Sequence, residues 1–278
     1  MHPYPAAPPT SRRTAFKIRA VGGLGLFGLL AVMALQTAQA SGDVRAVNPP
    51  MLSGSEVTSA TPTTGKPSTG KRPDFGQQAV SVEVSSLASW IVDSADNQGM
   101  PFMVVDKVNA QVLMFGNNGR LEGATAVLLG LARGDDSTPG IGERELSSIQ
   151  PHERTTPAGR FVASLDRDIH GTNILWVDYA TALSVHPVVK GTPREQRAQR
   201  LASSTVADNR ISFGCINVPV SFYDKVVSPA FTGTNGVVYI LPEIRTAHQV
   251  FGSYEVQNRQ TEAAKRTDSK QTADASGT

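Results

Sequence analysis

Short runs of apolar residues alternate with polar ones along the middle of the chain, and turns rich in glycine, asparagine and proline separate these runs. Period-two alternation predicts β-strands, whereas apolar residues three to four positions apart predict a helix. We therefore expect a mainly β domain, either a single β-sandwich or a partly closed barrel, with a few short helices. The expected strands span 102–105, 112–115, 121–131, 174–179, 182–186, 211–218 and 236–241, and the segment 156–161 is expected to turn into a further strand that ends at Ser164. The expected helices span 86–95 and 221–227, and the charged segment 194–201 is expected to be helical and exposed.

This apolar pattern is confined to residues 85–243, and a span of about 160 residues is enough for one hydrophobic core. The preceding residues, 41–84, are rich in serine, threonine, proline and glycine, which predicts a flexible linker. The residues that follow, 244–278, are polar and have few apolar side chains, which predicts a disordered tail. The sequence therefore indicates one folded domain without internal repeats.

The first forty residues have the pattern of a secretory signal. Basic residues within 12–19 precede an uncharged run, 20–35, and the small-residue pattern Ala38-Gln39-Ala40 follows it. This run is short for a spanning helix, which needs about 20 apolar residues. We expect cleavage before Ser41 and a mature protein in the periplasm or cell envelope.

Removing the signal changes the charge balance of the protein. Residues 1–40 carry four of the 26 Lys and Arg residues and no Asp or Glu, which leaves 22 basic against 24 acidic residues and a net charge of −2. The basic balance of the whole chain therefore belongs to the targeting segment, and we expect no nucleic-acid partner.

Cys215 is the single cysteine of the chain and follows a glycine within the segment 210–219. An exported protein with one cysteine has no internal disulfide, so this thiol is either a reactive group or a small buried apolar residue. A neighbouring imidazole can lower the pKa of a thiol and make it a nucleophile. His186 ends a strand-like alternation and is the expected base, whereas His170 lies beside a glycine and is the competing candidate.

Other common chemistries lack their motifs. The histidines have no metal-ligand spacing, and the chain contains neither His-Glu-x-x-His nor Cys-x-x-Cys. No glycine-rich phosphate loop joins a strand to a helix, and no Gly-x-Ser-x-Gly elbow is present. We expect the protein to need no metal and no cofactor.

Two segments together resemble a known family. Ser212-Phe-Gly-Cys-Ile-Asn217, an upstream histidine and the turn Thr156-Pro-Ala-Gly-Arg-Phe161 resemble the L,D-transpeptidase catalytic (YkuD-type) domain family over roughly residues 100–243. The resemblance implies an exported enzyme with a β-rich catalytic domain. Such enzymes cleave the bond after the third residue of a peptidoglycan stem peptide and pass the acyl group to an amine. When the amine belongs to an envelope protein, the reaction attaches that protein covalently.

The chain departs from the family pattern at two points. The family's histidine two positions before the cysteine is Phe213 here, and on an extended strand it would lie beside the thiol. His186 lies 29 residues before Cys215, which is longer than the usual gap, and the charged segment 194–201 accounts for the excess.

Each residue of this region has an expected role. Cys215 is the expected nucleophile and His186 the expected base, and backbone N–H groups of Cys215 with Gly214 or Phe213 would form an oxyanion hole. Ser212 would orient the imidazole. Asn217 would bind the polar end of the substrate or cap the next turn, and Arg210 would meet a substrate carboxylate or remain a solvated charge.

Two alternatives stay open at this stage. With water as the acceptor, the same thioester chemistry would make the protein an L,D-carboxypeptidase or amidase. A protein of a different class, a non-catalytic envelope-binding domain with a buried Cys215, would also fit the sequence.

Overall fold

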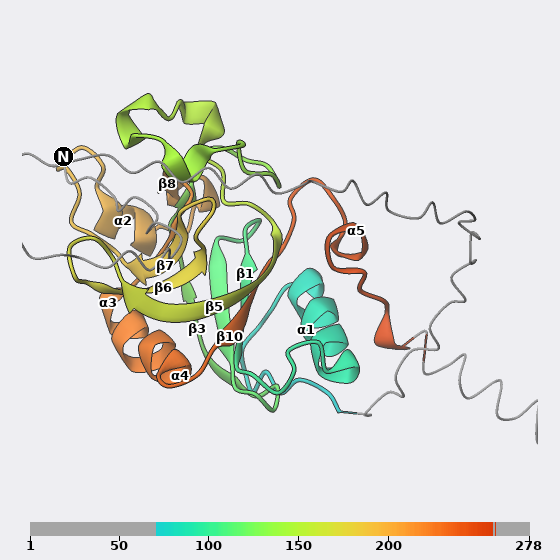
Figure 1. Cartoon of the computed structure of the whole chain (residues 1–278). Coiled ribbons are helices and arrows are strands. Elements are labelled where there is room, and N and C mark those ends of the chain that lie inside the picture. The colour runs from blue at the N-terminus through green and yellow to red at the C-terminus, as the bar shows by residue number, and fades with distance from the viewer. Residues whose placement is uncertain (1–70, 258, 260–278) are drawn as a thin grey trace, which may run out of the picture. The chain divides into compact units, whose positions relative to one another are not determined.

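The computed structural model describes residues 71–257 and 259 (Figure 1). The predicted signal segment, 1–40, and most of the predicted linker lie outside the described residues. Within the described part, a large β-sheet and a few short helices form the architecture, which confirms the predicted mainly β fold class. No helix in this part of the chain is long and apolar enough to cross a membrane.

The described residues form an eight-stranded sheet in the order β3-β2-β1-β10-β5-β6-β7-β9 and a separate pair, β4-β8. Neighbours are antiparallel except for the parallel pairs β1/β10, β7/β9 and β4/β8. The strands are β1 Phe102–Asp106, β2 Gln111–Phe115, β3 Leu121–Ala126, β4 Leu129–Gly130, β5 Gly159–Arg167, β6 Asn173–Asp178, β7 Leu183–Pro187, β8 Arg210–Ser212, β9 Ile216–Val218 and β10 Gly236–Ile240.

The two ends of the large sheet meet at a single bridge. Leu128 follows β3, and its backbone exchanges two hydrogen bonds of 2.9 Å with Asn217 of β9. This bridge brings the first and last strands of the sheet together, so the sheet curves into the partly closed barrel expected from the sequence. The long β5 makes the curve, because its C-terminal part pairs with β6 and its N-terminal part with β10 (Figure 1).

Two hydrophobic clusters lie on opposite faces of the sheet. In β1, Met103 and Val105 point into the barrel interior, whereas Phe102 and Val104 point toward the helix α1, Val82–Ser94. Every residue of β1 and β10 is buried, because both faces of these central strands are covered.

The predicted first helix is present and begins earlier than expected. Ser81 is its N-cap and accepts a hydrogen bond from the backbone N–H of Val84, so α1 starts four residues before the predicted position. As predicted, the side chains of Leu87, Trp90 and Ile91 are buried against the sheet.

The folded part extends beyond the predicted limits of 85 and 243 on both sides. Asp74 bridges to Arg120, and Phe75 packs against the cluster under α1. After β10, the helix α5 (Ala247–Phe251) is capped by Thr246 and packs against the same cluster. The expectation of a flexible linker and a disordered tail is therefore corrected for residues 71–84 and 244–257, and the division of the rest of the chain stays a prediction.

Two predicted strands are interrupted. The run 121–131 divides into β3 and β4, because the backbone leaves β2 and pairs first with Asn217 and then with β8. The run 211–218 divides into β8 and β9 at Gly214, which has φ +136°.

The remaining helices are short. The long connection before β5 carries three 3₁₀ turns and projects beside β8 (green in Figure 1). They are η1 Ile141–Glu143, η2 Leu146–Ser148 and η3 Pro151–Glu153, followed later by α2 Arg197–Ala202, η4 Val206–Asn209, α3 Val220–Phe222, the π-helical turn η5 Tyr223–Val227 and α4 Ser228–Phe231.

Candidate active site

The parallel pair β7/β9 brings Cys215 and His186 onto one face of the sheet. Its register places His186 opposite Asn217, and Ser184 Oγ lies 3.4 Å from Cys215 Sγ. Because side chains alternate along a strand, these four residues share a face, whereas Val185 and its partner residue Ile216 belong to the barrel core. The cysteine and histidine are therefore diagonal neighbours on a rigid strand pair.

A tight turn between β8 and β9 presents the cysteine. Gly214 has a φ of +136°, which side chains rarely allow, and a Cβ there would lie 2.9 Å from the carbonyl oxygen of Thr155. Ser212 Oγ accepts a hydrogen bond from Gly214 N–H (3.1 Å) and donates one to the carbonyl of Cys215 (2.6 Å). Ser212 therefore holds the turn, which corrects its expected role of orienting the imidazole.

The expected role of the Gly214 N–H as an oxyanion donor is also corrected, because this N–H already donates a hydrogen bond to Ser212 Oγ. The backbone N–H of Cys215 faces its own sulfur and contributes to lowering the thiol pKa. An oxyanion hole formed by the N–H groups of Cys215 and Phe213 stays a prediction.

The two segments that carry the family resemblance meet in space. Thr156 Oγ1 donates to the carbonyl of Gly214 (2.7 Å) and accepts from Gly130 N–H (2.9 Å), and Thr156 is fully buried. One hydroxyl thus links the turn before β5, the strand β4 and the cysteine turn, although these residues are far apart in the sequence.

Cys215 is a free, half-buried thiol. Its sulfur accepts a hydrogen bond from Ser184 Oγ and donates to the carbonyl of Ala182, both at 3.4 Å. Burial raises the pKa of the thiol, and the Ser184 hydroxyl, nearby backbone N–H groups and the positive charge of Arg197 only partly offset this effect.

His186 is buried, with 6% of its surface exposed. Its Nδ1 lies 2.8 Å from the carbonyl of Pro187, and its Nε2 lies 3.3 Å from Nδ2 of Asn217. A carbonyl accepts only, so Nδ1 carries the proton and Nε2 is the acceptor. The pKa of His186 is lowered to about 4. Burial is the main cause, the Pro187 carbonyl and Asp168 act in the opposite direction, and Arg197 adds to the lowering.

The resting pair is therefore a neutral thiol beside a neutral imidazole at pH 7, because both pKa shifts disfavour the ionised forms. A thiolate–imidazolium pair is disfavoured in the absence of substrate. The thiol hydrogen is directed to the carbonyl of Ala182, and the lone pair of His186 Nε2 accepts a hydrogen bond from Asn217 Nδ2.

Asn217 is fully buried and is not placed to contact a substrate. Its Oδ1 accepts from Nη1 of Arg197 (2.9 Å), and its Nδ2 donates to His186 Nε2 and to the carbonyl of Cys215 (3.2 Å). The expected substrate role of Asn217 is thus corrected to an internal link between the base, the cysteine and a buried cation.

The expected role of Arg210, as a substrate contact or a solvated charge, is also corrected. It is buried, and its Nη2 lies 2.8 Å from both Glu243 and the carbonyl of Lys107. The fully buried Lys107 forms an ion pair with Asp135 at 3.0 Å and lies 3.6 Å from Glu243. Arg210 therefore belongs to a buried charge cluster rather than to a substrate pocket.

Phe213 is not on a strand, since β8 ends at Ser212. The guanidinium of Arg154 lies over its ring, 3.9 Å from the centroid. The expectation of an aromatic wall on the strand face of the thiol is therefore corrected. His170 lies exposed in the turn after β5, where its backbone N–H donates to Asp168, so the structure places His186 and not His170 on the strand beside Cys215.

Two residues at this site were missed or misjudged from the sequence. Ser184 could have been found, because it lies two positions before His186 on the same strand face. Trp176 of β6 lies opposite Ser184 and is buried, and its ring stacks on Tyr179 with centroids 4.8 Å apart. Arg197 was expected to be exposed and is 4% exposed, and no local signal in its charged segment distinguishes it.

A shallow depression of about 410 Å³ lies elsewhere, between β5 and the end of α4. Its lining residues do not include the cysteine, the histidine or their partners. Within residues 71–257 and 259, no group of three His, Cys, Asp or Glu side chains is placed to hold a metal ion.

No family model and no curated protein matches this sequence. Among solved structures, the chain is similar to the helical cell shape determining protein Pgp2 from Campylobacter jejuni, with 12% identity over 53% of this chain and 49% of that chain and a TM-score of 0.34. It is also similar to an Enterococcus faecium L,D-transpeptidase, with 17% identity over 51% of this chain and 50% of that chain and a TM-score of 0.28. The chain spans about half the length of either structure, so its function has to be argued from its own residues.

Proposed function

We propose that this protein is an exported cysteine acyltransferase that acts on peptidoglycan stem peptides, with Cys215 as the nucleophile and His186 as the base. The observation that carries the proposal is the shared face of β7 and the start of β9, on which Cys215 and the imidazole of His186, whose Nε2 is an acceptor, are diagonal neighbours. The contact between Thr156 and Gly214 supports it, because it joins the two segments that resemble the L,D-transpeptidase family.

Acylation begins with the transfer of the thiol proton to Nε2 of His186. The thiol hydrogen first turns from the carbonyl of Ala182 toward the imidazole, where it replaces the hydrogen bond from Asn217 Nδ2 on Nε2. The sulfur then attacks the carbonyl carbon of the third stem residue. In this proposal the N–H of Cys215 is the donor to the carbonyl oxygen on which negative charge develops. When the tetrahedral intermediate collapses, His186 returns the proton to the departing amine of the terminal D-amino acid, which leaves a thioester on Cys215.

The second half of the reaction resolves the thioester. An acceptor amine gives up a proton to His186 as its nitrogen attacks the thioester carbon, and the thiol leaves with that proton. An acceptor amine on a second stem peptide gives a crosslink, and one on an envelope protein gives a covalent attachment. Water at the same position would make the enzyme an L,D-carboxypeptidase or amidase.

The neutral resting pair shapes this mechanism. A raised thiol pKa and a lowered imidazole pKa mean that proton transfer accompanies substrate attack instead of preceding it. The raised pKa of the thiol also favours the second candidate function, a non-catalytic envelope-binding domain, in which the thiol stays hydrogen-bonded to the carbonyl of Ala182. We also propose, from the predicted signal segment, that the protein acts in the periplasm or cell envelope.

Exchange of the terminal residue of a stem tetrapeptide separates these functions. The protein from residue 41 onward is incubated with the tetrapeptide and isotope-labelled D-alanine, and the products are followed by mass spectrometry. Labelled tetrapeptide indicates transpeptidation, and tripeptide alone indicates hydrolysis. Neither product, in a preparation that is folded and binds peptidoglycan, would reject the enzyme and support the binding domain.

A further inference from the structure

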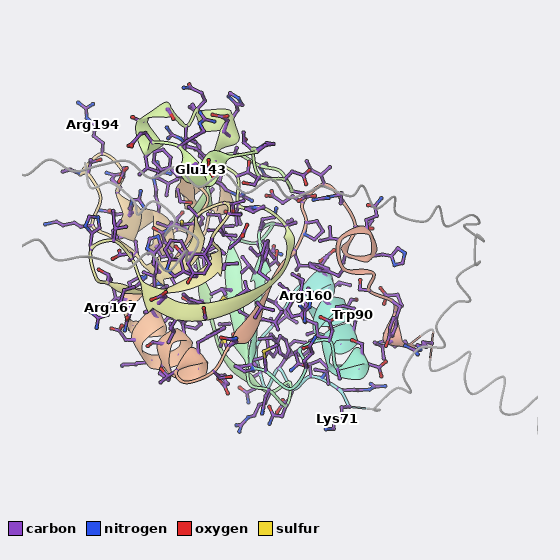
Figure 2. All side chains as sticks on the ribbon, viewed as in Figure 1. Lys71, Trp90, Glu143, Arg160, Arg167 and Arg194 are labelled. Atoms are coloured by element: carbon purple, nitrogen blue, oxygen red, sulfur yellow. The ribbon has the colours of Figure 1, made fainter. Side chains whose placement is uncertain are left out.

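A buried cation from the connection between β7 and β8 reaches the candidate site. The side chain of Arg197 is 3% exposed, whereas its neighbour Arg194 is exposed and points away from the protein (Figure 2). Its Nε lies 2.9 Å from Oε2 of Glu195, and its Nη1 lies 2.9 Å from Oδ1 of Asn217. One guanidinium thus holds both a carboxylate and the amide that contacts His186.

The backbone of this connection is shaped to deliver that side chain. Gln196, the residue before Arg197, has a left-handed φ of +45°, which is uncommon for a residue with a side chain. Gly191 has φ +61°, and a Cβ there would lie 2.1 Å from Glu195 Oε2 and 2.8 Å from Arg197 Nε. The chain therefore accepts local strain and a required glycine around the Glu195–Arg197 pair.

The hydrogen bonds of Asn217 leave one orientation for its amide. Oδ1 faces the guanidinium, and the two hydrogens of Nδ2 are used by His186 Nε2 and by the carbonyl of Cys215. A flipped amide would direct hydrogens at the guanidinium and an oxygen at the Cys215 carbonyl. The backbone of Asn217 is fixed as well, since it pairs with both Leu128 and β7.

We propose that Arg197 is a positioning residue for the candidate active site: it fixes the Asn217 amide, which in turn holds His186 as the Nδ1–H tautomer with Nε2 as an acceptor on the face of Cys215. Its role in catalysis rests on the proposed function. The orientation and tautomer are properties of the resting protein and can be measured without any reaction.

The charged groups around His186 define how the imidazole responds to changes at Arg197. Arg197 faces it from α2, Asp168 from the turn after β5 and Cys215 from the turn before β9, and Glu195 partly neutralises Arg197. Arg197 lowers and Asp168 raises the pKa of His186. Removing the positive charge therefore raises the pKa of His186, and releasing the amide allows the Nε2–H tautomer to form.

Nuclear magnetic resonance of ¹⁵N-histidine-labelled protein tests this proposal on the chain from residue 41. The ring nitrogen shifts of His186 report its tautomer and its pKa in the wild type, in Arg197→Met and in the control Arg194→Met, which removes an exposed charge from the same segment. We expect Arg197→Met to populate the Nε2–H tautomer and to raise the pKa, and Arg194→Met to leave both unchanged. Wild-type tautomer and pKa in a folded Arg197→Met protein would overturn the proposal.

If Arg197→Met does not fold, Arg197→Lys provides the test. It keeps the charge and replaces the planar fork by a single ammonium group, so we expect a partial shift toward the Nε2–H tautomer with a pKa near that of the wild type. An unchanged tautomer population in the folded Lys variant would overturn the proposal.

Kinetics separate this inference from the proposed function. If the wild type forms a thioester, we expect Arg197→Met to lower kcat by on the order of 10-fold or more with little change in KM, since it affects the base and not the substrate contacts. A raised KM at constant kcat would contradict the positioning role. If the wild type forms no thioester but the tautomer shifts in Arg197→Met, the proposed function fails and the structural role of Arg197 holds.

Discussion

At the scale of single residues, environment determines the chemistry of this site more than residue type does. The cysteine and the histidine have the identities of a catalytic pair, but burial keeps both neutral at rest. A thiol activated by an adjacent imidazolium would react with alkylating reagents in mildly acidic solution, whereas a neutral buried thiol would react slowly there.

Alkylation kinetics test the neutral pair. Because burial raises the pKa of Cys215, we expect its reaction rate with iodoacetamide to rise continuously with pH, up to and above pH 9, without a plateau at lower pH. Intact mass against time at a series of pH values measures this rate, with Cys215→Ala as the blank. A plateau below pH 7 would show a preformed ion pair and contradict the described environment.

The lowered pKa of His186 should make the stability of the protein depend on pH. The folded-state pKa of His186 is about 4 against an ordinary value of 6.5, so between these pH values the unfolded chain binds a proton that the folded chain excludes. The free energy of unfolding therefore falls as the pH decreases from 6.5 to 4, by about 1.4 kcal/mol per pH unit at most. Urea unfolding across this range should show a shallower slope for His186→Gln than for the wild type, and parallel curves would argue against a depressed pKa.

At the scale of elements, the cysteine turn depends on a backbone conformation and on contacts from distant segments. Gly214 connects β8 to β9, Ser212 closes the turn, and Thr156 fixes its carbonyl from the other side. Two short strands and a turn could not hold a nucleophile in place by themselves, so these side-chain bonds provide the rigidity.

Replacing Gly214 by alanine should therefore destabilise the protein. Its φ of +136° is poorly accessible to alanine, and the new Cβ would lie 2.9 Å from the Thr155 carbonyl. We expect a loss of roughly 1–3 kcal/mol in the free energy of unfolding, measured by urea denaturation. Gly233→Ala is the matched control, because Gly233 also has a positive φ (+75°) but open space around it, and an equal loss in both variants would show that the contact with Thr155 is unimportant.

The strands β1, β2 and β10 were predictable from the sequence because each is a short apolar run between turn residues. The position of His186 on a strand end was predictable from the alternation that it ends. The break at Gly214 was not, since Phe213 and Ile216 continue the apolar pattern across it and the turn is held by Thr156, which is distant in sequence. Arg197 and Arg210 were not predictable either, because their burial depends on partners in other segments.

At the scale of the whole domain, a buried charge cluster joins segments that come from both ends of the described chain. Lys107 follows β1, Asp135 lies in the long connection, Arg210 opens β8 and Glu243 follows β10. Asp135 also accepts hydrogen bonds from three successive backbone N–H groups, 243–245, which together with Lys107 hold its pKa at about 2 despite burial. The cluster thus ties the ends of β1 and β10 to the start of β8 and to the long connection.

Arg210→Met distinguishes this structural role from the substrate contact expected from the sequence. Removing the guanidinium leaves the carboxylate of Glu243 buried with reduced compensation, which should lower the free energy of unfolding by about 3–5 kcal/mol. Arg133→Met is the control, because Arg133 is exposed and lies 3.8 Å from the same carboxylate. Unchanged stability with a raised KM for the stem peptide in Arg210→Met would restore the substrate role.

The proposed function depends on acylation of Cys215, and the intact mass of the protein after incubation with a carbapenem measures this acylation. A carbapenem carries a strained amide that a competent thiol opens to form a stable thioester, so the adduct reports nucleophile and base together. We predict a stoichiometric adduct on the wild type, none on Cys215→Ala and a strongly slowed adduct on His186→Gln. A folded wild type that forms no adduct would contradict the enzyme, and a full rate in His186→Gln would contradict the assigned base.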